Sequence, residues 1–354
     1  SHSEALMLSM GFEALISTCE SRTEQPAFGV FSNPTSKTVF VAIRGTVTNL
    51  DWITNLRCEP QQNYFPTSTR PLKISSHGAF FRAAVWVLWQ IKGPLLKMVA
   101  AGYKVRVTGH SYGAAVAVFL AAMLIPDVGT EDEKLRVVVF SAPPMVDQTF
   151  ATWLRSVAPE DFLTGVLLGF DIVPRLSLGV LGSFDGGRVA HLDKSTQKNS
   201  SHCVEPVALQ ANKPAGSKRK HGTDPTQNDS KITVLSPDSK KRKIEQNDAE
   251  QQAQQPNVTR ASEQQAEQPQ QLEQREVADE NSKQVDLIFP GRVLYLHPRE
   301  DSTIQAYLLP AESAAMHPVM RTLPLSSSAV DHHKLNNVGE ALQECLMSTV
   351  ARNV

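Results

Sequence analysis

The chain has 354 residues, of which 41% are hydrophobic and 20% are charged, and its formal net charge is −1. Such a composition can bury a substantial core and excludes a fibrous or wholly disordered protein. A charge so close to zero also excludes a general attraction to nucleic acid, so any electrostatic targeting must come from local clusters. The cysteines form neither a CxxC pair nor a disulfide framework, which argues against structural zinc; they are Cys19, Cys58, Cys203 and Cys345.

The first half of the chain alternates between strand-like and helix-like patterns. The strand-like stretches are "AFGVF" (27–31), "KTVFVAIRG" (37–45), "KVRVTG" (104–109), "LRVVVFSAPP" (135–144) and "LTGVLLGF" (163–170). The helix-like stretches are 79–100 and the apolar run that follows Ser111. Alternation of this kind predicts crossover units and a mostly parallel sheet with helices on both faces. Arg106 departs from the pattern, because it places a charge in a strand that is otherwise apolar.

The composition then changes. No aromatic residue occurs between Phe184 and Phe289, and glutamine dominates residues 246–274. A segment with so little apolar surface cannot offset its ordering entropy, so we predict that residues 211–283 form a disordered, low-complexity insertion. Order is expected to resume at "VDLIFPGRVLYLHP" (285–298) and to end in a helix at "VGEALQECLMSTV" (338–350). Residues 1–354 are therefore predicted to form a single domain with the insertion inside it.

No stretch of the sequence predicts a membrane span. The two most apolar regions, 83–101 and 165–182, are interrupted by charged residues and proline. The chain begins Ser1-His2-Ser3, without the basic and apolar pattern of a secretory signal. The missing initial Met indicates a fragment, so an upstream targeting or membrane segment could precede it.

One short motif points to chemistry. Gly109-His110-Ser111-Tyr112-Gly113 lies between the strand-like 104–109 and the apolar helix. The bare pattern occurs by chance in about one chain in ten of this length. Here, however, a strand enters, a helix leaves and glycines flank the serine, as a nucleophile elbow requires. The helix N-terminus and the Tyr112 amide would favour an oxyanion, so Ser111 is the candidate nucleophile.

A serine nucleophile needs a base and an acid that orients the base. In folds that carry a nucleophile elbow, the acid and the base follow the nucleophile along the chain in the order Ser, Asp, His. Asp171 is the best-placed acid, because it follows an apolar strand at its carboxyl end. Asp147 is interpreted instead as a helix N-cap, and Asp185 lies in the turn "FDGG". For the base, His332 and His333 are the leading candidates because they lie in a loop just before the last helix; His297 and His317 remain behind them.

Together these motifs resemble the class 3 lipases, and most closely the catalytic domain of the sn-1-specific diacylglycerol lipases. The resemblance rests on "FVAIRGT", "DWITNL", "SHGAFF", "VTGHSYGAA", "VVFSAPP", "LLGFDIVPRL", "FPGRVLYLHP" and "DHH", and covers nearly all of the chain outside the insertion. It implies an α/β-hydrolase fold with Ser111 as nucleophile, Asp171 as orienting acid and His332, the first histidine after Asp331, as general base. It also implies an oxyanion hole formed by the backbone N–H groups of Thr46 and Tyr112. Tyr112 stands where the family usually has Leu.

The resemblance implies a serine lipase that hydrolyses diacylglycerol to monoacylglycerol and a fatty acid, without a metal or organic cofactor. Triacylglycerol, monoacylglycerol, phospholipid and galactolipid remain alternative substrates. A non-catalytic lipase-like scaffold that acts through the insertion is the alternative of another class. Residues 55–77, with Tyr64 and Phe65, occupy the family's lid position and are expected to shield the acyl channel.

The expected location follows from the substrate. We expect a cytoplasmic protein, peripheral at a membrane or lipid-droplet surface. The insertion carries a basic cluster, Lys240, Lys241, Arg242 and Lys243, that could contact anionic lipid or importin, with nuclear import as the weaker expectation. A solvated run of charge in a loop would have the same sequence.

Overall fold

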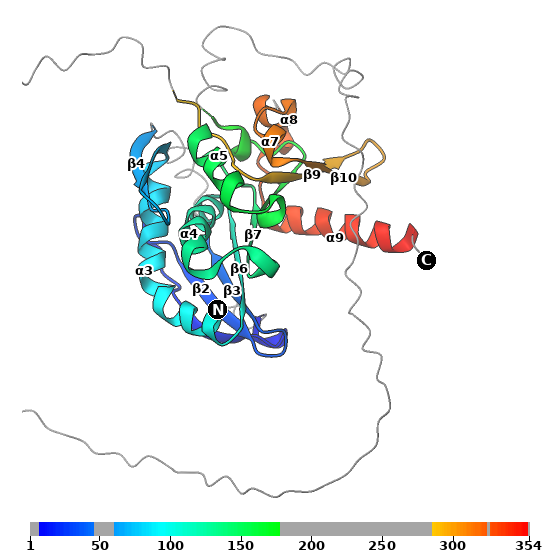
Figure 1. The fold of residues 1–354 in the computed structure, drawn as a ribbon. Coiled ribbons are helices and arrows are strands. Elements are labelled where there is room, and N and C mark those ends of the chain that lie inside the picture. Colours follow the sequence, from blue (N-terminus) through cyan, green and yellow to red (C-terminus); the bar gives the residue numbers. More distant parts are fainter. Residues whose placement is uncertain (1–6, 46–59, 178–284, 324–325, 353–354) are drawn as a thin grey trace, which may run out of the picture. The chain divides into compact units, whose positions relative to one another are not determined.

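The computed structural model describes residues 7–45, 60–177, 285–323 and 326–352 (Figure 1). These residues belong to one unit, formed by the chain up to residue 212 and from residue 282 onward. The predicted insertion at 211–283 lies outside the described residues, as do Asp185 and the basic cluster at 240–243. Their predicted roles therefore stay predictions.

An eight-stranded sheet organises the described residues, in the order β1-β2-β3-β6-β7-β8-β9-β10. Its strands are β1 (Glu13–Ser17), β2 (Phe28–Asn33), β3 (Thr38–Ile43), β6 (Lys104–His110), β7 (Leu135–Phe140), β8 (Leu163–Leu168), β9 (Arg292–Pro298) and β10 (Ile304–Leu309). Parallel pairing joins β3–β6, β6–β7, β7–β8 and β8–β9. Antiparallel pairing joins β1–β2, β2–β3 and β9–β10. The predicted mostly parallel sheet is confirmed.

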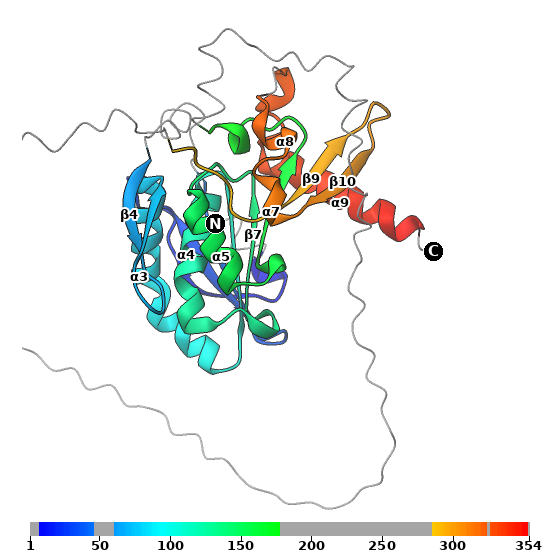
Figure 2. The same cartoon turned by 45° about the horizontal axis from the view of Figure 1, so that its top comes forward.

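Helices cover both faces of this sheet (Figures 1 and 2). The longer ones are α3 (Gly78–Ala100), α4 (Tyr112–Val128), α5 (Gln148–Val157) and α9 (Leu335–Arg352), and the short ones are α7 (Ala311–Ala314) and α8 (Pro318–Arg321). Single 3₁₀ turns are η1 (Glu131–Glu133), η2 (Glu160–Phe162), η3 (Val173–Arg175) and η5 (Ser327–Ala329). None of the helices within the described ranges combines the length and hydropathy needed to cross a bilayer.

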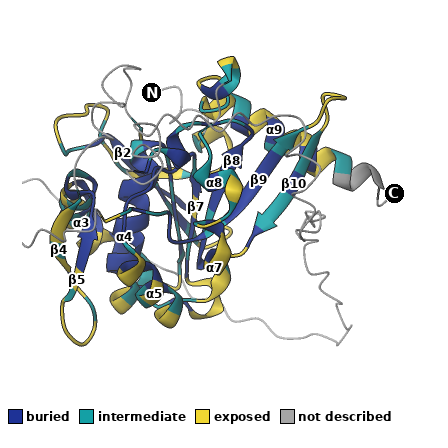
Figure 3. Cartoon of the chain, turned by 90° about the horizontal axis from the view of Figure 1, so that it is seen from above, coloured by how far each residue is buried: buried dark blue, intermediate teal, exposed yellow. Residues whose placement is uncertain are grey.

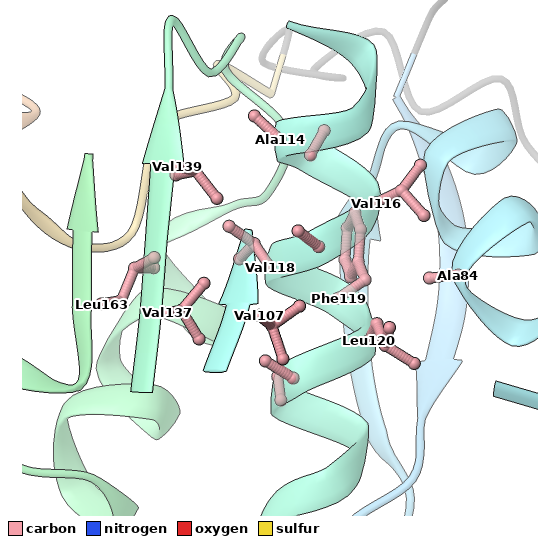
Figure 4. Packing of buried hydrophobic residues seen from close by; sticks show 14 of the residues in the cluster. Ala84, Val107, Ala114, Val116, Val118, Phe119, Leu120, Val137, Val139 and Leu163 are labelled. Carbon is pink, nitrogen blue, oxygen red and sulfur yellow. The ribbon is translucent and has the colours of Figure 1, made fainter. Parts of the chain in front are cut away.

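The main core lies between the sheet and α4. This helix is apolar on nearly every side, as expected for a helix enclosed by other elements. Figure 4 shows Val118 of α4 facing Val107 of β6 and Val137 of β7, while Phe119 and Leu120 face the side on which α3 contributes Ala84. Because α4 is buried from Gly113 to Leu124, its packing fixes the position of its N-terminus relative to the ends of the strands.

The second face of the sheet is covered by α9 only toward one edge. There Val338, Ala341 and Cys345 pack on strands β8, β9 and β10. Nearer the centre, alternate residues of β3, β6 and β7 are half-buried, and Val138 is 42% exposed. By contrast, α4 is buried along most of its length (Figure 3). Arg106 points to the open part of the second face, where its guanidinium donates to the carbonyls of Val105 and Glu133. A charge is tolerated in this strand because its side of the sheet is not enclosed.

Part of the predicted lid is a β-hairpin. Strands β4 (Gln61–Phe65) and β5 (Leu72–Ser76) pair with each other beside α3. The ring of Phe65 is fully buried against Phe150 and Trp153, whereas Tyr64 is 68% exposed. Phe65 is thus a core anchor of the hairpin, and the prediction that residues 55–77 shield an acyl channel stays a prediction. Residues 55–59 of the predicted lid lie outside the described ranges.

Candidate active site

The turn from β6 into α4 has the conformation of a nucleophile elbow. Ser111 separates the strand from the helix and has φ 56° and ψ −123°, a backbone conformation that non-glycine residues rarely adopt. A Cβ on Gly109 would lie 2.2 Å from the carbonyl oxygen of Gly113. Glycine at 109 is therefore required for the strand and the helix to approach so closely, as the sequence predicts.

Ser111 lies in a chain of hydrogen bonds with a histidine and a buried carboxylate. His333 Nε2 is 3.0 Å from Ser111 Oγ, and His333 Nδ1 is 3.1 Å from Asp171 Oδ1. The carboxylate only accepts, so Nδ1 carries the proton and Nε2 is free to accept from the serine hydroxyl. The Asp171 side chain is 0% exposed and that of His333 is 12% exposed, so their hydrogen bond is largely shielded from water.

The expectation that His332 contacts the serine is wrong. His332 turns the other way and its Nδ1 accepts the backbone N–H of Phe170 at 2.7 Å. Its ring stacks on Phe170 with a centroid distance of 5.7 Å. The two histidines are adjacent in a turn between η5 and α9, so their side chains diverge, and only that of His333 faces the elbow.

The acid is held by its own loop and by a buried arginine. The N–H of Val173 donates to Asp171 Oδ1 at 3.0 Å. Arg175 is 3% exposed and donates to the carbonyls of Gly169, Asp171 and Val319. Burial lowers the pKa of this guanidinium, although the nearby Asp171 and Tyr295 favour its charged form. Sequence reasoning missed Arg175 because a charge after Val-Pro at a strand end resembles an ordinary surface residue.

The other sequence candidates lie elsewhere. Asp147 is the N-cap of α5 as predicted, and it accepts from the N–H of Phe150 at 2.9 Å. His297, on β9, lies 3.1 Å from the hydroxyl of Tyr295. His317 caps α8 by accepting the N–H of Val319. Within the described residues, none of these three hydrogen-bonds to Ser111.

The expected oxyanion donors are only partly described. Tyr112 is the first residue of α4, so its N–H lies at the positive end of a long helix and directly after the nucleophile. Its ring packs edge-on against Phe80, 5.5 Å between centroids, and burial raises the pKa of its hydroxyl. The partly buried Tyr112 ring thus packs against the core beside the elbow. Thr46 lies outside the described residues.

His110 is a further residue of the site that sequence reasoning did not single out. Its ring lies 4.7 Å from that of His333, and its Nε2 donates to the His333 carbonyl at 2.7 Å. Burial, followed by the neighbouring His333, lowers the pKa of His110. In the described part of the chain, no three His, Cys, Asp or Glu side chains converge in the manner of a metal site.

The part of the chain that carries the elbow matches the model of a known protein family. The family model "Lipase (class 3)" matches residues 40–180, which include the second part of β3, the elbow and Asp171. The chain is 25% identical over 194 residues to diacylglycerol lipase-alpha of Homo sapiens and of Mus musculus. That match covers 52% of this chain but only 18% of the relative, so the chain spans less than a fifth of the relative's length.

Solved structures of fungal lipases are similar to about half of the chain. The native propeptide complex of the Rhizomucor miehei lipase is 24% identical, with a TM-score of 0.39, and the similarity covers 48% of this chain and 52% of that one. For the Lip2 lipase of Yarrowia lipolytica the values are 23% and 0.40, with 47% and 62% covered. The family match, over residues 40–180, includes the elbow, so this part of the chain is similar to the class 3 lipases, and the described sheet is that of an α/β-hydrolase fold.

Proposed function

We propose that the chain is a serine carboxylic-ester hydrolase that acts on glycerolipids. The observation that carries the proposal is the continuous hydrogen-bonded chain from Ser111 through His333 to the buried Asp171. A serine hydroxyl is a weak nucleophile until an adjacent base removes its proton, and this geometry supplies that base. A non-catalytic scaffold would have no need for it.

The proposed reaction proceeds through an acyl-enzyme. Ser111 Oγ attacks the ester carbonyl while its proton passes to His333 Nε2, and Asp171 stabilises the resulting imidazolium through Nδ1–H. The Tyr112 N–H donates to the tetrahedral oxyanion, with the Thr46 N–H as the second donor that the family resemblance implies. His333 then gives its proton to the departing glyceride oxygen. Water repeats the sequence on the acyl-enzyme and releases a fatty acid.

The favoured substrate within this class is diacylglycerol, which would yield monoacylglycerol and a fatty acid. Its support is the similarity to diacylglycerol lipase-alpha, which extends over about half of this chain. Because such a substrate resides in a membrane or a lipid droplet, the proposed enzyme acts as a peripheral protein at a lipid surface. Triacylglycerol, monoacylglycerol and polar glycerolipids are the competing substrates.

Active-site labelling tests the chemistry. We expect a fluorophosphonate probe to label the wild-type chain, to fail with Ser111→Ala and to react far more slowly with His333→Ala. Ser156→Ala is the matched control, because its exposed hydroxyl lies on α5 and donates to the Trp153 carbonyl of the same helix. Labelling that survives Ser111→Ala would reject the nucleophile.

Product analysis tests the substrate. Mixed micelles that contain equal amounts of diacylglycerol and triacylglycerol, with distinguishable sn-1 acyl chains, should release fatty acid mainly from the sn-1 position of diacylglycerol. Equal release from both lipids would retain the hydrolase and reject the diacylglycerol preference.

A further inference from the structure

Two histidines beside the Ser111–His333–Asp171 hydrogen bonds tie the loop of His333 to other elements. His110, at the end of β6, donates from Nε2 to the His333 carbonyl at 2.7 Å. His332, in the loop itself, accepts at Nδ1 from the Phe170 N–H at 2.7 Å. The first contact joins the loop to the elbow, and the second joins it to the segment that carries Asp171.

Within the described ranges, the backbone-to-backbone hydrogen bonds of His332 and His333 themselves are local. The backbone N–H groups of His332 and His333 bond to Ser328 and Val330, which are close neighbours in the chain. Such local bonds shape the turn but do not fix its position relative to β6 or β8. The contacts of His110 and His332 span 223 and 162 residues and do fix that position.

The surroundings of His332 are fitted to this contact. Gly169 has φ +44°, and a Cβ there would lie 2.6 Å from His332 Nδ1. A side chain at 169 would therefore displace the ring from the Phe170 amide. The adjacent Gly169 carbonyl accepts from Arg175, so the same short segment is held on its other side.

The geometry points to His110 and His332 as positioning residues that hold the His333 imidazole in line between Ser111 and Asp171. This inference rests on the proposed function, since positioning has a purpose only if His333 is the base. In the part of the chain that the structure describes, neither residue hydrogen-bonds to Ser111 or Asp171. Each acts through the backbone that carries His333 or through the segment before Asp171.

The two contacts require defined tautomers. A carbonyl only accepts, so His110 must carry its proton on Nε2; an amide only donates, so His332 Nδ1 must be bare. Protonating His110 would leave its bond intact, whereas protonating His332 would replace an acceptor with a donor that faces the Phe170 N–H. The charged groups that face His332 are Asp171 and Asp331, which favour its protonated form, and Arg175, which opposes it.

Paired substitutions separate positioning from packing. In His332→Asn the side-chain oxygen occupies the place of Nδ1 and keeps the acceptor, whereas His332→Leu keeps volume and removes the acceptor. In His110→Gln the amide nitrogen occupies the place of Nε2 and keeps the donor, whereas His110→Leu removes it. If the rings mattered only as filling, the Leu variants would be the better tolerated.

The measurements are kcat, KM, the rate of fluorophosphonate labelling and the melting temperature of the full chain. We expect each Leu variant to lose roughly 10- to 100-fold in kcat and labelling rate, as small misplacements of a base do, with KM little changed. The Asn and Gln variants should recover most of that loss at a similar melting temperature. Leu variants that match wild type, or that surpass Asn and Gln, would overturn the inference.

Side-chain nitrogen NMR of the uniformly ¹⁵N-labelled chain supplies a readout that does not depend on activity. At neutral pH we expect both His110 and His332 as neutral rings with the proton on Nε2. A proton on Nδ1 of His332, or a bare Nε2 on His110, would overturn the contacts themselves. If wild type is labelled and His333→Ala is not, but the Leu variants react normally, the positioning role fails and the hydrolase stands. If wild type is never labelled, the hydrolase fails, and the tautomers still decide the contacts.

Discussion

Gly113, the second residue of α4, lies against the end of β3, so that a Cβ at this position would come within 2.3 Å of the Ile43 carbonyl oxygen. The backbone of one strand is therefore in contact with the first turn of the helix that follows the neighbouring strand. This contact holds the N-terminus of α4, and with it the Tyr112 amide, at the carboxyl end of the sheet.

Gly113→Ala should consequently destabilise the fold and reduce activity. The added methyl group meets backbone instead of a yielding side chain, and overpacking of this kind costs about 1–3 kcal/mol of unfolding free energy. Urea denaturation would measure the loss. Gly93→Ala is the control, because nothing lies within 4 Å of a Cβ there and alanine favours the helix. Equal stability of both variants would contradict the close contact.

Phe65→Ala should be far more destabilising than Tyr64→Ala, although the two residues are adjacent. Phe65 is fully enclosed by aromatic rings, and removing such a side chain costs about 3–5 kcal/mol. Tyr64 is exposed, so its truncation should change the unfolding free energy by no more than about 0.5 kcal/mol. Chemical denaturation of the pair distinguishes a core anchor from a mobile cover. Similar losses of unfolding free energy in the two variants would instead favour the lid interpretation of Phe65.

Arg175→Met should disorder the segment that carries Asp171. The substitution leaves the carbonyls of Gly169, Asp171 and Val319 without their donor, and an unsatisfied buried group costs about 1–3 kcal/mol. Arg175→Lys keeps the charge but lacks the planar fork, so we expect an intermediate loss of both stability and kcat. Arg299→Lys is the control, because that guanidinium is exposed and donates to the Gln305 side chain. Full activity of Arg175→Met would show that the clamp is dispensable.

The stability of the fold should fall as the solution is acidified through the histidine range. Burial is the leading cause of a lowered pKa in four histidines, His110, His297, His317 and His332. The unfolded chain then binds protons more readily than the folded one, so stability rises with pH. This contribution is complete above the unfolded value of about 6.5 and is lost as pH falls from there toward the lower folded values.

Urea midpoints at about pH 7.5 and pH 5.5 would measure this effect, since the two values bracket the unfolded histidine pKa. The midpoint should be lower at the acidic pH, and the double variant His110→Gln, His332→Asn should show a smaller difference. Glu24 and Asp331 also have lowered pKa values, but their window lies below that of histidine. An unchanged midpoint would contradict the linkage.

The sequence predicts the sheet and the elbow well because both depend on local pattern. The elbow is built from consecutive parts of the sequence: β6, the two glycines and the apolar α4. Asp171 likewise comes shortly after the end of β8. The edge strands β1 and β10 have no comparable signal: β1 is almost wholly exposed, so no alternation of apolar and polar residues marks it.

The choice between His332 and His333 is beyond such reasoning. Both lie in a turn without periodicity, and rotating the chain by one residue exchanges which ring faces the elbow. The contacts that decide it come from His110 and Phe170, more than 160 positions away. Phe65 is similar, because its burial depends on α5, which the sequence of the hairpin does not specify.

The three residues of the hydrogen-bonded chain are divided between two stretches of polypeptide. Ser111 and Asp171 belong to the described stretch that ends at residue 177, and His333 belongs to the part that begins at residue 285. The two stretches meet where β8 pairs in parallel with β9, with Thr164 opposite Arg292. If the two stretches were made as separate polypeptides, each would carry an incomplete active site and would need the other to complete it. Recovery of probe labelling when such fragments are combined would therefore report the closure of the sheet itself, and the active site would serve as an indicator of folding.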